Sequence, residues 1–240
     1  MQEIKLNTHI SGRFNLELEN LRNSVLTMGG MVEQQLCDAI AALRDNHMAL
    51  AEKVIVNDFT LNTMEVQIDE ECTRIIAKRH PAASDLRLVL AINKTTADLE
   101  RMGDDIERIA NLLIKGSLPV SQDIKNGMIA TGNHVMEMLR KTLNAFARLD
   151  GEAALEIHMG DQEIDEQYKQ LLTLAVTEMQ QDTELLPQWL EVLWAMRALE
   201  RVGDRCKNVC EYIIYLVKGK DVRHISREEL QKRLAELRQS

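Results

Sequence analysis

The chain has 240 residues, a formal net charge of −9 and an aromatic content of only 3%. The acidic balance argues against a nucleic-acid-binding module, which needs basic patches. The length is enough for one large or two small cores. The apolar residues are mostly Leu, Ile, Met and Ala, and three prolines and 11 glycines leave few turns. We therefore predict an all-α protein.

Six long helices are predicted from the apolar periodicity and from the breaks in it. They span about residues 11–46, 48–79, 84–115, 121–149, 151–180 and 185–218. Ser84 is expected to cap the third helix, and Pro119 separates the two halves. Helices of about 30 residues are stable only when they pack side by side in bundles.

Apolar residues in the third and sixth predicted helices repeat with the same spacing of 3, 4, 3 and 4. The two series are Leu99, Met102, Ile106, Ile109 and Leu113, and Leu199, Val202, Cys206, Val209 and Ile213. This spacing is typical of the seam of a helical bundle. We therefore predict a tandem duplication of three-helix bundles over residues 8–117 and 119–218, followed by a short tail helix at 221–240.

A six-residue sequence occurs once in each half, as LERMGD at 99–104 and LERVGD at 199–204. Glycine in a helix interior costs about 1 kcal/mol relative to alanine, so Gly103 and Gly203 indicate close approach by another group. Within each motif the glutamate and the aspartate lie one helical turn apart on the same side. That side faces away from the apolar seam. Taken by itself, an acid pair in this position is typical of a solvated acidic face.

The helix before each motif carries matching acidic or amide residues. Antiparallel packing about a turn near residue 81 places Asp58 level with Asp104, and Asn62 level with Glu100. A turn near residues 182–183 likewise places Asp161 level with Asp204, and Asp165 level with Glu200. Glu65 and Asp69 continue the first stripe, whereas the second has Tyr168 and Leu172 there, so the two sites should differ.

Carboxylates concentrated in this way repel one another unless a cation lies among them. A divalent or trivalent metal ion would serve, because hard cations favour oxygen ligands. Nearby arginines would also serve, and the candidates are Arg101, Arg108, Arg197 and Arg201. The residues alone leave both possibilities open.

On these motifs, together with SDLRLVL at 84–90, the chain resembles the PhoU family over about residues 8–218. The resemblance implies a multinuclear metal site on the outer surface of each bundle, with iron, zinc, magnesium or manganese as the ion. The implied ligands are Asp58, Glu100 and Asp104 in the first half and Asp161, Asp165, Glu200 and Asp204 in the second. Asn62 replaces an acid of the family, so the first site is expected to hold fewer ions or to use Glu65 and Asp69.

The resemblance also implies a non-enzymatic regulator of phosphate uptake that represses phosphate-starvation genes. Its implied partners are the ATPase subunit of the phosphate ABC transporter, a sensor histidine kinase and a second copy of the chain. The polar start and the lack of about 18 consecutive apolar residues predict a cytoplasmic protein without membrane insertion.

Two other classes of protein remain as alternatives. One is a carboxylate-bridged metal enzyme or metal store, although none of the six histidines follows a glutamate by three residues, as ferritin-like sites require. The other is a purely structural bundle, against which the matched glycines and acids argue.

Overall fold

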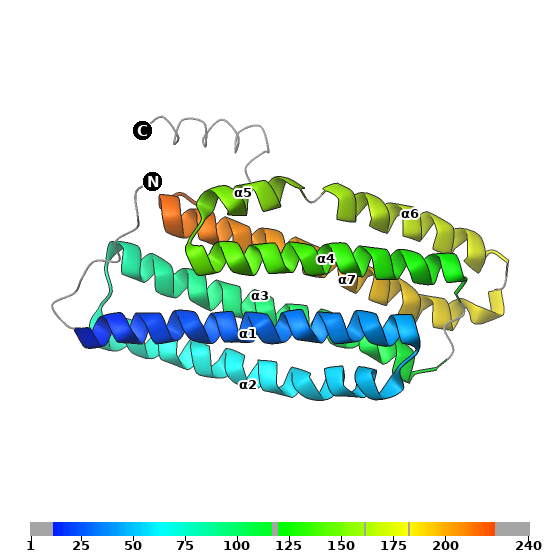
Figure 1. The fold of residues 1–240 in the computed structure, drawn as a ribbon, viewed down its shortest axis with the longest axis horizontal. Coiled ribbons are helices and arrows are strands. Elements are labelled where there is room, and N and C mark those ends of the chain that lie inside the picture. Colours follow the sequence, from blue (N-terminus) through cyan, green and yellow to red (C-terminus); the bar gives the residue numbers. More distant parts are fainter. Residues whose placement is uncertain (1–11, 117–119, 161, 182, 224–240) are drawn as a thin grey trace.

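The computed structural model describes residues 12–116, 120–160, 162–181 and 183–223, and the regular elements in these ranges are all helices. They are α1 (Gly12–Asp45), α2 (Met48–Arg79), α3 (Ala83–Ile114), α4 (Gln122–Arg148), α5 (Gly151–Gly160), α6 (Gln162–Met179), the 3₁₀ helix η1 (Thr183–Leu185) and α7 (Leu186–Lys218). The helices run along the long axis of the molecule (Figure 1). In the described ranges, no helix combines the length and the apolar character that a membrane span requires.

Two predicted helix boundaries are wrong. The helix expected at 151–180 is two helices, because α5 ends at Gly160 and α6 starts at Gln162. Glycine weakens a helix interior, and Asp161, between the two helices, lies outside the described residues. In addition, α3 starts before Ser84, after an extended Ala82 that makes no side-chain cap bond.

Some sequence predictions fall outside the described residues. The tail helix expected at 221–240 lies outside the described residues from residue 224 onward. The predicted ligand Asp161 also lies outside them. The predicted ends of the two bundles lie partly in the same undescribed segments and stay predictions.

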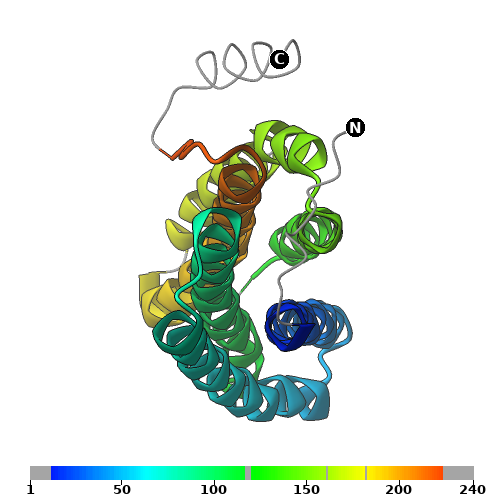
Figure 2. The same ribbon diagram turned by 90° about the vertical axis from the view of Figure 1, so that its left-hand side faces the viewer.

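The two apolar seams predicted in α3 and α7 are confirmed, because all ten residues are buried. The seams join the two repeats into one structure, in which α3 packs along α7 and α1 packs along α4. The end-on view shows α3 and α7 side by side, with α1 and α4 next to one another on the other side (Figure 2). Helix α2 packs on α1 and α3, while α5 and α6 pack on α4 and α7.

Reciprocal glycine contacts bring α1 and α4 close together. A Cβ at Gly29 of α1 would lie 2.4 Å from Leu143 Cδ2 of α4. A Cβ at Gly132 of α4 would lie 2.2 Å from Ile40 Cδ1 of α1. Each helix thus supplies one glycine and, eleven residues later, the branched aliphatic residue that covers the partner's glycine. The contact is therefore the same in both directions, as at a two-fold axis.

A buried ionic network lies between α3 and α7. The Arg205 guanidinium donates from Nε and Nη2 to Asp105 Oδ2, at 3.2 and 3.1 Å. Its Nη1 lies 3.6 Å from Asp98 Oδ1, and Tyr212 donates its hydroxyl to Asp98 Oδ2 at 2.9 Å. Arg205 and both aspartates are buried. Because a buried charge must be paired, the network allows only one antiparallel register of α3 against α7.

Replacing Arg205 by methionine should destabilise the protein by about 3–5 kcal/mol, because Asp98 and Asp105 would keep their buried charge without its partner. The control is Arg201→Met, since Arg201 is 42% exposed and lies 3.5 Å from the same Asp105; its cost should be below about 1 kcal/mol. Urea unfolding followed by circular dichroism measures both. Equal effects of the two variants would contradict a central role for Arg205.

Candidate metal centre

Three carboxylates converge in the second repeat. Asp165 projects from α6, and Glu200 and Asp204 project from successive turns of α7. One carboxylate oxygen from each lies within 4.8 Å of the other two. The four-residue spacing on α7 puts its two acids on one side of the helix, and the packing of α6 on α7 brings in the third. We refer to these three residues as the carboxylate cluster.

Cations only partly balance the carboxylate cluster. Arg197 forms an ion pair with Glu200, and Lys207 Nζ lies 2.8 Å from Asp204 Oδ1. Glu200 is only 8% exposed, and its Oε2 has no hydrogen-bond partner among the described residues. Burial, and then the Asp204 charge, raise the pKa of Glu200, although Arg197 opposes the shift. An added hard cation with oxygen ligands would fit this donor set.

The acids of the first repeat are arranged differently. Asp58 of α2 is 5% exposed and lies against Gly103 of α3, where a Cβ would be 2.8 Å from Asp58 Oδ1. Asn62 donates its amide to Asp58 Oδ2 at 3.1 Å. Burial raises the pKa of Asp58 and so does the Asp104 charge, while the neighbouring Gln35 side chain and the hydrogen bond from Asn62 lower it. The glycine therefore lets an acid of one helix reach the backbone of the next.

Gln35 of α1 belongs to this region but was not predicted. It is 1% exposed, donates to the Val54 carbonyl at 3.2 Å, and leaves its Oε1 buried without a donor. Asp58 Oδ1 and Asn62 Oδ1 are also buried and unpaired within the described residues. The sequence feature that could have indicated Gln35 is a polar amide among the core residues of α1, between Val32 and Leu36.

The remaining predicted acids of the first repeat lie along the same stripe. Glu100 and Asp104 are half-buried, and burial, followed by the charges of Asp104 and Glu65, raises the pKa of Glu100. Asp69, by contrast, is exposed and accepts a hydrogen bond from Asn93. Asp58 and Glu200 are buried, so the interpretation of the motif acids as a solvated face does not hold for Glu200.

The arginines near the motifs have different partners. Of the four candidates, Arg197 pairs with a motif acid, whereas Arg201 and Arg108 lie 3.5 and 3.8 Å from Asp105 of the α3–α7 network. Arg101 is exposed, and its charge lowers the pKa of Glu100. Gly203 is buried in α7 beside the carboxylate cluster. Arginine thus neutralises these acids only in part.

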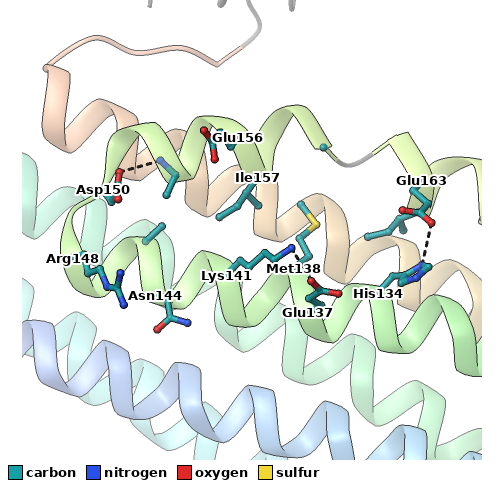
Figure 3. Close-up of a pocket in the computed structure, with 14 residues that line it drawn as sticks. His134, Glu137, Met138, Lys141, Asn144, Arg148, Asp150, Glu156, Ile157 and Glu163 are labelled. Atoms are coloured by element: carbon teal, nitrogen blue, oxygen red, sulfur yellow. Dashed lines mark hydrogen bonds and ion pairs between the residues drawn. The ribbon is translucent and has the colours of Figure 1, made fainter. Parts of the chain in front are cut away.

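A pocket of about 530 Å³ lies elsewhere, between α4 and the α5–α6 pair (Figure 3). Met138 and Ile157 line it together with charged side chains. Some of these polar side chains lie close together within its walls: Lys141 lies 2.7 Å from Glu137, and His134 lies 3.8 Å from Glu163. None of the three residues of the carboxylate cluster lines it. The pocket and the cluster are separate features.

Comparisons with known proteins identify the repeats. The PhoU domain matches residues 25–113 and 129–213. The chain is 47% identical to the phosphate-specific transport system accessory protein PhoU of Escherichia coli over 98% of each chain. A crystal structure of PhoU from Pseudomonas aeruginosa superposes with a TM-score of 0.80 at 43% identity, covering 86% of this chain and 100% of that one. The PhoU structure from Streptococcus pneumoniae gives 0.79 at 31% identity, covering 87% and 99%.

Substituting Gly103 by alanine should destabilise the protein by about 1–2 kcal/mol, because the new methyl group would overlap Asp58 Oδ1 and Leu61 Cδ1. Gly30→Ala is the matched control: its Cβ would contact nothing within 4 Å, so helix propensity should stabilise by about 0.5–1 kcal/mol. Thermal unfolding of both variants gives the comparison. A stabilised Gly103→Ala protein would show that this glycine is not needed for close approach.

The raised pKa of Glu200 predicts a pH-dependent stability of the metal-free protein. The folded state holds a proton on Glu200 more tightly than the unfolded chain does, so this stabilisation is complete below the ordinary value of 4.5 and is lost as the pH rises through the raised pKa. Glu200→Gln is always neutral and should melt above the wild type at pH 7. The two melting temperatures should converge at pH 4, and a constant difference between them would argue against this origin.

Proposed function

The chain belongs to the PhoU family, and on that premise we propose that it is an accessory regulator of phosphate uptake and not an enzyme. The observation that carries this proposal is the 47% identity, over 98% of both chains, with a protein named as an accessory of the phosphate-specific transport system. The match to the PhoU domain covers both repeats.

The more specific proposal concerns partners. The protein acts in the cytoplasm, contacts the ATPase subunit of the phosphate ABC transporter and a phosphate-sensing histidine kinase, and thereby represses phosphate-starvation genes. Exposed apolar side chains support protein contacts: Val56 and Phe59 of α2 are 65% and 72% exposed, and Leu190 and Trp194 of α7 are 52% and 62% exposed. Apolar surface of this kind is enriched at interfaces, and it also suits a homodimer.

We further propose that motif carboxylates bind a divalent or trivalent ion such as iron, zinc, magnesium or manganese. The carboxylate cluster supports this, because it offers three oxygen ligands and a buried carboxylate oxygen without a partner. A bound ion would supply the positive charge that Arg197 and Lys207 supply only in part. It would also link α6 to α7, so that metal occupancy would stabilise the second repeat.

The same cluster favours a second candidate function, a carboxylate-bridged metal-binding or metal-storage bundle. The two functions differ in their consequence for the host. A regulator changes phosphate-starvation output when it is removed, whereas a store changes only the metal content of the cell.

Deleting the gene in its host should raise alkaline phosphatase, a usual product of phosphate-starvation genes, in phosphate-replete medium. The wild-type gene supplied on a plasmid should restore low activity, because the repressor returns. Unchanged low activity after deletion would contradict the regulatory proposal and favour the metal store.

The double variant Asp104→Asn with Asp204→Asn should keep its helicity but bind less metal per chain, because it loses one carboxylate from each motif. Elemental analysis after loading with Mn²⁺ and desalting measures the bound metal. Glu191→Gln, on α7 but paired with Lys115 at 2.9 Å, is the control and should bind as the wild type does. Unchanged metal content in the double variant would argue against metal binding by the motif acids.

A further inference from the structure

We propose that the two repeats are not equivalent as metal sites: metal is held by Asp165, Glu200 and Asp204 of the second repeat, and Asn62 keeps the first repeat from holding it. This inference rests on the metal binding proposed above and assigns Asn62 a role in metal specificity. The duplication allows Asn62 to be compared directly with Asp165. From the sequence, Asn62 is expected level with Glu100 in the first repeat, as Asp165 is with Glu200 in the second.

The first argument is the number of carboxylates that converge. In the second repeat, oxygens of three carboxylates come within 4.8 Å of one another. Within the described part of the first repeat, no three acidic, histidine or cysteine side chains converge in this way. The missing member is at position 62, where the neutral amide brings no charge to offset that of a metal ion.

The second argument is the direction of the Asn62 amide. Its Nδ2 donates to Asp58 Oδ2 at 3.1 Å, so the amide presents its N–H groups, which cannot bind a cation, to the carboxylate beside it. The other oxygen of Asp58 lies under Gly103, where a Cβ would be 2.8 Å away. One oxygen of Asp58 is thus held by a hydrogen bond from Asn62, and the other has no donor and is packed against the backbone at Gly103.

The third argument concerns the buried oxygens of the first repeat that lack donors. They belong to Gln35, Asp58 and Asn62, and two of the three are neutral amide oxygens. Gln35 is further fixed by its hydrogen bond to the Val54 carbonyl. This donor set is poorer in charge than the three carboxylates of the second repeat. A multivalent ion that selects charged oxygen ligands would therefore occupy the second repeat first.

The test is a Mn²⁺ titration of the metal-free full-length protein, with free Mn²⁺ followed by electron paramagnetic resonance. We expect Asp204→Asn to remove tight binding and Asp104→Asn to leave the wild-type stoichiometry unchanged. Two further variants exchange the residues that differ: Asn62→Asp should increase the number of ions bound, and Asp165→Asn should weaken Mn²⁺ binding at least tenfold. Circular dichroism verifies that each variant is folded.

The outcomes separate this inference from the metal-binding proposal on which it depends. If Asp104→Asn and Asp204→Asn each remove a share of the bound Mn²⁺, both repeats bind metal and only the inference of non-equivalence is wrong. If the wild type binds no Mn²⁺, the metal-binding proposal itself is wrong. If a folded Asn62→Asp protein binds no additional ion, Asn62 is not the residue that excludes metal. Should that variant unfold, a full wild-type stoichiometry in Asp165→Asn would equally overturn the inference.

Discussion

The rest of the structure depends on the buried contact of Arg205 with Asp105 and Asp98, because it fixes how α3 lies along α7. These two helices carry the repeated motifs, and Asp105 and Arg205 directly follow Asp104 and Asp204 in the sequence. The same helical turn therefore serves two purposes. In each of these helices, one side of the turn holds the two repeats together. The adjacent side presents the motif acids to the preceding helix of the same repeat, which is α2 for α3 and α6 for α7.

The scaffold is nearly symmetric, whereas its sites are not. The reciprocal contacts of Gly29 with Leu143 and of Gly132 with Ile40 show how closely the two repeats match where α1 meets α4. The motif regions have diverged: the first repeat has an asparagine hydrogen-bonded to a buried aspartate, and the second has three converging carboxylates. The residues at the contact of α1 with α4 therefore match between the repeats, whereas the residues of the motif regions do not.

The sequence was sufficient to predict the helices, the duplication and the level at which Asp165 meets Glu200, because these follow from local periodicity and from the length of a turn. It did not reveal the break at Gly160. Glycine weakens a helix interior, but the spacing of apolar residues does not show at which glycine a helix ends. Gln35 was missed for a related reason, since it reaches the first site from α1, a helix with no motif of its own. The network around Arg205 was likewise not predicted, because it joins residues 100 positions apart.

The pairing of Asp105 with Arg205 has a consequence for how such a molecule can be assembled. The two residues occupy the same place in their respective repeats, immediately after LERMGD and LERVGD, and they face each other across the centre of the molecule. Two identical copies of one repeat, related by a two-fold axis, would set aspartate against aspartate or arginine against arginine in a buried position. Covalent fusion removes that restriction, because the two sides are then free to carry opposite charges. The central ion pair thus requires two repeats that differ at this position, and two copies of either half alone could not reproduce it.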